Sequence, residues 1–306
     1  MKKRLFSLLI VVGVAFSLLL TGCGRDLDEL VLPEAGDAEE EQELPEAGET
    51  EEEPEEPEVR ETVTLVVGAT PTPHAQILEQ VVDVLYEEGI ILEIVEFTDF
   101  ILPNLALNDG ELHANYFQHV PYMESFNNEH GTEIVPVEGG GIHYEPLGIY
   151  PGRSDDLNNV PEGAIIAIPN DVTNAARALN LLEANGLITL AEGAGLLATS
   201  RDIEDNPHNI EIYEVAAAQL ARILPDVDFA VINGNFALQA GLTVENDALA
   251  AEDPESPAAQ TYMNVVAVRA GDEDNPVIRR LVEVIQSEEI RQFILENYQG
   301  AVVPLF

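Results

Sequence analysis

The residues best suited to bind a small molecule gather in three short clusters. The first, residues 114–122, sets Phe117, His119 and Tyr122 around a predicted strand-to-helix turn. Open α/β sheets bind ligands beyond the carboxyl ends of their strands, where this cluster falls. Two aromatic rings and a histidine can line a ligand pocket there, or they can pack half-buried against the sheet. The residues by themselves leave both interpretations open.

The second cluster, residues 169–177, places an arginine close to a predicted helix start. Asp171 or Thr173 can cap this helix, because a side-chain oxygen can accept from its free N–H groups. Arg177 falls in the first predicted turn, where the helix macrodipole disfavours a cation. An anion held by both the arginine and the helix N-terminus would explain the placement. The third cluster, residues 231–235, ends a buried strand in two asparagines and is at least turn chemistry.

The sequence contains no pattern typical of an active centre. Residues 139–141 are glycines, but neither a lysine nor a helix follows them as a phosphate loop requires. The histidines lack metal-ligand spacing and are expected at the surface or in packing. We therefore expect no enzymatic activity, no metal and no cofactor. The six histidines are His74, His113, His119, His130, His143 and His208.

The only cysteine, Cys23, marks where the mature chain is expected to begin. Three cationic residues at positions 2–4 precede an apolar stretch at 5–20, and Thr21 and Gly22 stand before the cysteine. The apolar stretch is short of the roughly 17 to 25 residues that a membrane-spanning helix needs. We therefore predict a lipoprotein signal peptide at residues 1–22 rather than an anchor helix. Lipid on Cys23 would hold the protein on the extracytoplasmic face of the cell membrane.

Charge defines the next segment and restricts the partners of the whole protein. Residues 25–60 hold 17 acidic residues against two arginines. We predict that residues 23–60, lipidated at Cys23, form a disordered tether, with a cation-binding tail as the alternative. From residue 61 onward there are 40 acidic residues, eight arginines and no lysine. This charge excludes nucleic acid and anionic lipid surfaces as partners. It fits a salt-rich habitat or an ordinary acidic extracellular protein.

Two cycles of strands and helices must position the clusters. The first cycle has strands at 62–69, 90–97, 112–116 and 133–137, with helices at 74–88, 102–108 and 121–130. The second has strands at 142–150, 164–168, 209–215 and 228–232, with helices at 174–184 and 216–224. A strand at 263–268 and helices at 276–286 and 288–297 follow.

Repeated βαβ units of this kind favour a parallel sheet with helices on both faces. Two cycles joined in the middle of the chain predict two α/β lobes with a cleft between them. The first lobe comprises residues 61–143 plus about 262–306, and the second comprises about 144–261.

At the three clusters the chain resembles the methionine-binding lipoproteins of bacterial ABC importers, the NlpA/MetQ type. The likeness covers essentially all of residues 62–306 and is carried by long gap-free stretches. These are residues 114–122, 168–179, 230–235 and 301–306. The resemblance implies a type II periplasmic-binding-protein fold, whose two lobes are joined by a hinge and close around one free amino acid.

The resemblance also implies eight ligand-binding residues. Those of the apolar pocket match Phe100, Phe117, His119 and Tyr122, and those of the head-group site match Asn174, Arg177, Asn233 and Asn264. Arg177 takes the position of the arginine that binds the ligand carboxylate. Phe100 stands where members often carry tyrosine, which leaves the pocket wall more apolar. Residues 257–262 look like a local insertion, which bears on the alignment of Asn264.

The function implied is capture of L-methionine and its delivery to the permease and ATPase subunits of an importer, by a monomeric protein held on the membrane through its lipid anchor. A thioether beside aromatic rings gains about 0.3 to 1.5 kcal/mol. A net-neutral zwitterion is not repelled by an acidic protein. The alternatives are D-methionine, another hydrophobic amino acid or a short methionine-containing peptide as ligand. More remote alternatives are a surface lipoprotein without a transport role and a hydrolase.

Overall fold

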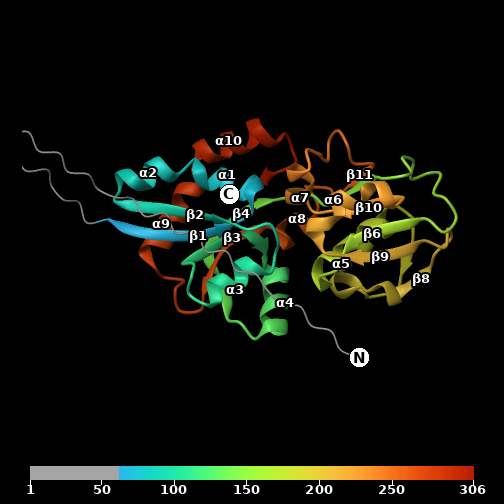
Figure 1. The fold of residues 1–306 in the computed structure, drawn as a ribbon, viewed down its shortest axis with the longest axis horizontal. Coiled ribbons are helices and arrows are strands. Elements are labelled where there is room, and N and C mark those ends of the chain that lie inside the picture. The colour runs from blue at the N-terminus through green and yellow to red at the C-terminus, as the bar shows by residue number, and fades with distance from the viewer. Residues whose placement is uncertain (1–61) are drawn as a thin grey trace, which may run out of the picture. The chain divides into compact units, whose positions relative to one another are not determined.

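Two β-sheets organise the protein, and each is flanked by helices (Figure 1). The computed structural model describes residues 62–306. The predicted signal peptide, Cys23 and the acidic tether lie outside the described residues. The described residues belong to one compact unit.

The first sheet has six strands in the order β13-β4-β12-β3-β1-β2. They are β1 (Val63–Ala69), β2 (Ile90–Glu96), β3 (Ala114–His119), β4 (Ile134–Tyr144), β12 (Asn264–Arg269) and β13 (Val303–Pro304). β1 pairs in parallel with both β2 and β3, but β12 runs antiparallel between β3 and β4. The prediction of a parallel sheet is therefore wrong for this half. The chain passes through the second sheet before it forms β12, and it re-enters the first sheet from the opposite end.

Helices cover both faces of the first sheet. One face buries the apolar sides of α1 (Gln76–Glu79), α2 (Val82–Glu87), α9 (Pro276–Ile285) and α10 (Glu288–Tyr298). The other face carries α3 (Leu102–Asn108) and α4 (Val120–His130), which lie below the sheet in Figure 1. The single helix predicted at 74–88 is instead three pieces. The kinked segment η1 (Pro71–Ala75), in which Thr72 is extended, leads into α1, and a turn separates α1 from α2.

The second sheet has five strands in the order β11-β5-β10-β6-β9. They are β5 (Gly148–Pro151), β6 (Ile165–Pro169), β9 (Glu211–Val215), β10 (Phe229–Ile232) and β11 (Ala250–Ala251). β10, β6 and β9 are parallel, whereas β5 and β11 add an antiparallel edge. This sheet is also mixed, so the expectation of a parallel sheet holds only for its centre.

The second sheet is likewise covered on two sides. α5 (Val172–Ala184) buries one whole face in a core with β5, β6 and β10. α6 (Leu220–Ile223) and α7 (Gly234–Gln239) contribute to a second core. The remaining elements are short: β7 (Thr189–Leu190), β8 (Ile203–Asp205), η2 (Gly195–Leu197), η3 (Ser200–Asp202), η4 (Ala217–Gln219) and η5 (Leu224–Asp226).

The chain crosses between the sheets twice. It leaves β4 for β5 through residues 145–147 and returns from β11 to β12 through residues 252–263, which include α8 (Pro257–Thr261). The predicted strand at 142–150 is therefore two strands separated by the first crossing. We call the part built on the six-stranded sheet the first lobe and the part built on the five-stranded sheet the second lobe. That the lobes move as separate bodies at these boundaries remains a prediction.

Candidate functional site

A small cavity of about 20 Å³ lies where the two lobes meet. This volume has room for about one water molecule, so a ligand the size of an amino acid would need the lobes to move apart. The first lobe and the first crossing contribute Phe100, Phe117, Gln118, His119, Tyr122, Glu145 and Asn264. The second lobe contributes Asn174, Arg177, Asn233, Gly234 and Asn235. All eight residues predicted to bind a ligand therefore line one cavity, although their contact with a ligand remains a prediction.

Strand ends and helix starts bring these side chains together. Phe117 and His119 lie at the end of β3, a central strand whose residues are all buried. His119 caps α4, because its Nδ1 accepts from the backbone N–H of Tyr122 at 3.2 Å. Across the cavity, α5 and α7 begin directly after β6 and β10. The ligand-site position expected for open α/β sheets is therefore occupied by polar groups from both lobes.

One side of the cavity is an aromatic wall. The ring centroids of Phe100, Phe117 and Tyr122 lie 5.7 to 6.2 Å apart, and Phe236 of α7 lies 4.7 Å from Phe100. The hydroxyl of Tyr122 donates to the carbonyl oxygen of Phe100 at 2.7 Å, so its polar atom is satisfied within the wall. The rings pack on one another and also face the cavity. The two interpretations of this cluster, a pocket wall and packing against the sheet, therefore both hold.

The opposite side is built from asparagines with unused hydrogen-bonding capacity. Asn233 donates through Nδ2 to Oδ1 of Asn174 at 2.9 Å. Its own Oδ1 is buried and has no partner among the described residues, and the same is true of Nδ2 of Asn235. Because a buried polar atom without a partner is costly, each of these atoms is a candidate for a bond to a ligand. One is an acceptor and the other a donor.

Arg177 has an anionic partner within the chain. Its guanidinium donates through Nε and Nη2 to the two carboxylate oxygens of Glu252, and Nη2 also donates to the carbonyl oxygen of Glu145 at 2.7 Å. Both side chains are buried, with exposures of 5% and 10%. The anion beside Arg177 is a side chain that accepts from Tyr144 and Leu147 and not from the N-terminus of α5, so it is not the predicted anion held jointly with the helix start. Arg177 also lies in the second turn of α5, not the first, because the helix begins at Val172.

Glu252 ties the two crossings together. Besides Arg177, its carboxylate accepts from the hydroxyl of Tyr144 at 2.6 Å and from the backbone N–H of Leu147 at 2.8 Å. The guanidinium of Arg177 lies 4.4 Å from the ring centroid of Tyr262, on the second crossing. Arg177 and Glu252 thus form a buried ion pair at the junction of the lobes, beside the cavity.

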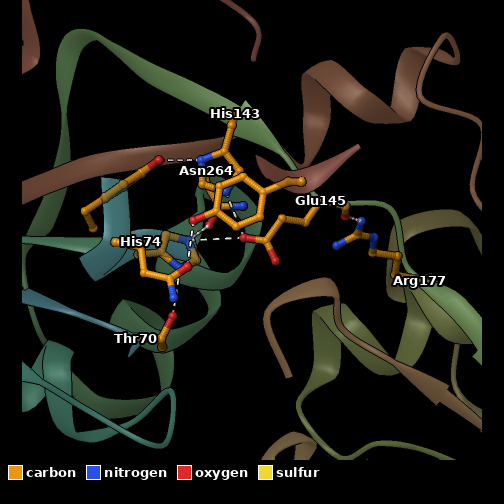
Figure 2. A network of polar contacts seen from close by, with 9 residues as sticks. Thr70, His74, His143, Glu145, Arg177 and Asn264 are labelled. Carbon is orange, nitrogen blue, oxygen red and sulfur yellow. Dashed lines mark hydrogen bonds and ion pairs between the residues drawn. The ribbon is translucent and has the colours of Figure 1, made fainter. Parts of the chain in front are cut away.

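A buried histidine–glutamate network adjoins the cavity on the first-lobe side (Figure 2). Oε1 of Glu145 accepts from Nε2 of His143 at 2.8 Å and lies 3.3 Å from Nε2 of His74. His74 also contacts Oδ1 of Asn264 at 3.1 Å and the hydroxyl of Thr70 at 2.7 Å. His143, which looked isolated in the sequence, is fully buried here.

Burial controls the ionisation of this network. It lowers the pKa of His74 to about 4, although the charge of Glu145 acts in the opposite direction. It also lowers the pKa of His143 to about 3, so both rings are neutral at pH 7. Burial raises the pKa of Glu145, which His74 and Arg177 partly offset. The carboxyl group of Glu145 is the acidic group of the cavity lining.

His74, His143 and Glu145 also have the chemistry of metal ligands, and their donor atoms lie within 4.8 Å of one another. Each of these atoms, however, is paired inside the network at ordinary hydrogen-bond distances of 2.8 to 3.3 Å. Hydrogen bonds therefore account for the burial of all three groups without a metal ion, because each group has a partner within the network.

Four cavity residues were not predicted: Gln118, Glu145, Gly234 and Asn235. Asn235 lies in the third cluster, and its partnerless amide could not be recognised without the helix α7. Gly234 must lack a side chain, because an added Cβ would lie 2.8 Å from the Cβ of Glu145. Glu145 was not singled out in the sequence, although its partner His143 is only two positions away; its other partner, His74, is 71 positions away.

The NlpA lipoprotein family model matches residues 65–306, nearly all of the described part of the chain. The chain belongs to the NlpA lipoprotein family. A relative within this family is the methionine-binding lipoprotein MetQ of Bacillus subtilis, which is 40% identical over 244 residues, 79% of this chain and 88% of the relative.

Solved structures of similar lipoproteins agree with the fold. A lipoprotein from Ruminococcus gnavus has a TM-score of 0.78 at 52% identity, over 79% of this chain and 99% of the other. A nutrient-binding protein from Burkholderia cenocepacia, solved with methionine bound, has a TM-score of 0.73 at 41% identity, over 79% and 100%. The predicted substrate-binding-protein fold is therefore confirmed for this NlpA lipoprotein. Within residues 62–306, none of the helices is both long and apolar enough to cross a bilayer.

Proposed function

We propose that this protein captures free methionine and delivers it to an ABC importer. The observation that carries the proposal is a single buried cavity with an aromatic wall on one side and partnerless amide groups on the other. A methionine zwitterion has a flexible apolar side chain for the first side and a charged head group for the second. The relatives named for methionine binding support the same ligand.

The cavity groups suit the two ends of the head group. Oδ1 of Asn233 and the carboxyl group of Glu145 can accept from the ligand ammonium. Nδ2 of Asn235 can donate to the ligand carboxylate, beside the guanidinium of Arg177. Hydrogen bonds to charged groups contribute about 1.5 to 3 kcal/mol each. Burial of the thioether side chain contributes roughly 1.5 to 3 kcal/mol.

The aromatic wall accounts for the choice of side chain. Sulfur beside a ring gains about 0.3 to 1.5 kcal/mol, and Phe100, Phe117 and Tyr122 offer three rings to one thioether. Isosteric aliphatic amino acids lose only this contribution. We therefore propose methionine as the preferred ligand, with leucine-like amino acids as weaker competitors, and of its two enantiomers we propose L-methionine.

Calorimetric titration of the full chain in detergent tests the ligand, with L-methionine, D-methionine, norleucine, leucine and glycylmethionine as the panel. L-methionine is expected to bind most tightly and, at 100 times its dissociation constant, to stabilise the fold by about 2.7 kcal/mol. Asn235→Ala should weaken binding at least tenfold with little change in melting temperature, because its Nδ2 has no partner among the described residues. Asn158→Ala, at an exposed turn of the second lobe, is the control. No binding of methionine, or tighter binding of another ligand, would refute the proposal.

The cellular role follows from the family and the sequence. We propose that lipid on Cys23 holds the protein on the extracytoplasmic face of the membrane, and that the monomer hands its ligand to permease and ATPase subunits. We propose no enzymatic activity. Uptake of labelled methionine by cells that carry or lack the protein tests the transport role, and uptake independent of the protein would contradict it.

A further inference from the structure

A chain of three hydrogen-bonded side chains in the second lobe ends at the cavity. The carboxylate of Asp171, the N-cap of α5, accepts from Nδ2 of Asn174 at 3.0 and 3.1 Å. Oδ1 of Asn174 then accepts from Nδ2 of Asn233 at 2.9 Å. The last atom of the chain is Oδ1 of Asn233, which is buried and has no partner among the described residues. Asp171 itself lies behind Asn174, outside the twelve described residues that line the cavity.

The chemistry of the first link fixes the orientation of the last. A carboxylate only accepts hydrogen bonds, so Asn174 must turn its NH₂ group toward Asp171 and its carbonyl oxygen toward Asn233. Asn233 must then donate to that oxygen, which leaves its own carbonyl oxygen facing the cavity. Two amides alone could adopt either orientation, because reversing both preserves their mutual bond. The anionic end of the chain removes this ambiguity.

A second contact fixes the same orientation from the other side. Nδ1 of His119 accepts from the backbone N–H of Tyr122, so the proton of the neutral ring is on Nε2. Nε2 lies 3.3 Å from Oδ1 of Asn174 and donates to it. This bond is longer than the bonds to Asp171. Asn174 is thus held between an acceptor on its nitrogen side and two donors on its oxygen side.

We infer that Asp171 is a positioning residue for ligand recognition: acting through Asn174, it orients the amide of Asn233 so that a carbonyl oxygen meets the ligand ammonium. The inference rests on the proposed function and goes beyond it, because it assigns selection for a free amino group to a residue outside the cavity. Compounds with the same side chain and carboxylate but no ammonium gain nothing from this orientation.

The substitution Asp171→Asn tests the inference with little change in shape. Asparagine caps helices as well as aspartate does, so α5 is expected to remain capped. One carboxylate oxygen becomes an NH₂ group about 3 Å from the NH₂ group of Asn174, and the two donors repel. The preferred orientation of Asn174 and Asn233 is then weakened, because only the longer contact with Nε2 of His119 still favours it.

The readout compares methionine with 4-(methylthio)butanoate, its analogue without the amino group, by calorimetry on the full chain in detergent. Asp171→Asn should weaken methionine binding about tenfold and leave binding of the analogue unchanged within a factor of two. The control Asp156→Asn removes an equal charge from an exposed turn of the same lobe, where Asp156 accepts from the backbone and side chain of Asn158. It should change neither affinity.

A double-substitution cycle separates positioning from general damage. In an Asn233→Ala background, Asp171→Asn should have no further effect on methionine affinity, since the oriented oxygen is already gone. Equal weakening of both ligands by Asp171→Asn, an unchanged methionine affinity, or additive effects in the cycle would each overturn the inference alone. If the unsubstituted chain binds no amino acid, the proposed function fails and the inference fails with it.

Discussion

The ion pair between Arg177 and Glu252 gives the sharpest prediction about stability. Arg177 holds the position that the family resemblance assigns to ligand binding, so Arg177→Ala would be expected to abolish binding and leave the fold intact. The buried pair contradicts the second half of that expectation. Removing one partner of a buried pair leaves an uncompensated charge, which costs about 3 to 5 kcal/mol. We therefore expect Arg177→Met to lower the free energy of unfolding by that amount.

The magnitude translates into a large thermal effect. For a protein of this size each kcal/mol shifts the melting temperature by about 2 to 4 °C, so Arg177→Met should lower it by roughly 6 to 20 °C. Glu252→Gln should act similarly, because the amide presents an NH₂ group to donors from Arg177, Tyr144 and Leu147. The double substitution should cost less than the sum of the two, since neither leaves a lone buried charge.

Differential scanning calorimetry of the ligand-free protein measures these shifts. Arg153→Met is the matched control, because Arg153 also forms an ion pair, with Asp228 at 2.7 Å, but its side chain is 48% exposed. An exposed pair contributes about 0 to 1 kcal/mol, so this variant should melt within a few degrees of the unsubstituted protein. If Arg177→Met melted like the Arg153→Met control and still lost all methionine binding, Arg177 would act only in ligand binding. The ion pair would then contribute nothing to the stability of the fold.

Three further predictions address the aromatic wall, the buried histidines and the anchor. Phe100→Leu should weaken methionine binding by about two- to tenfold in calorimetry and leave norleucine binding nearly unchanged, because only the sulfur–ring contact is lost; equal losses for both ligands would contradict this. The buried state of His143 has a lowered pKa of about 3, so its contribution to stability is present above its unfolded pKa of about 6.5 and is lost as the pH falls toward 3. The free energy of unfolding should therefore fall between pH 6.5 and 4.5, and in His143→Gln this fall should be smaller by up to about 2 to 3 kcal/mol, as measured by urea titrations. An unchanged pH dependence would show that His143 does not titrate on unfolding. Cys23→Ser should move the protein from the detergent phase to the aqueous phase in Triton partitioning, and retention in detergent would argue against a lipid on that residue.

Local sequence patterns predicted most helices and strands but not the way the strands are ordered. α3 was predicted with its observed bounds, because Pro103 favours a helix start and the apolar positions repeat with helical spacing. α7 was missed, since Asn233 and Gly234 were attributed to a turn. The antiparallel insertion of β12 between β3 and β4 depends on where the chain returns from the second lobe, and no local pattern encodes that.

Contacts between residues far apart in the sequence also account for the parts of the candidate site that were not predicted. The eight predicted residues came from the family resemblance, and single-sequence patterns had drawn attention only to the three clusters. The position of Arg177 near a helix start predicted an anion held jointly with that helix, whereas the carboxylate beside it belongs to Glu252. Glu252 lies 75 positions from Arg177, and such pairings arise only from the three-dimensional fold.

The late position of β12 has a consequence for the order in which the protein can assemble. The second lobe is one uninterrupted segment, so all its strands are available once residue 251 has been synthesised. The first sheet must wait longer, because β3 and β4 have no common neighbour until residues 264–269 arrive. Until then the edges of β3 and β4 that β12 will cover have no native partner, and unpaired strand edges of this kind favour association with other chains.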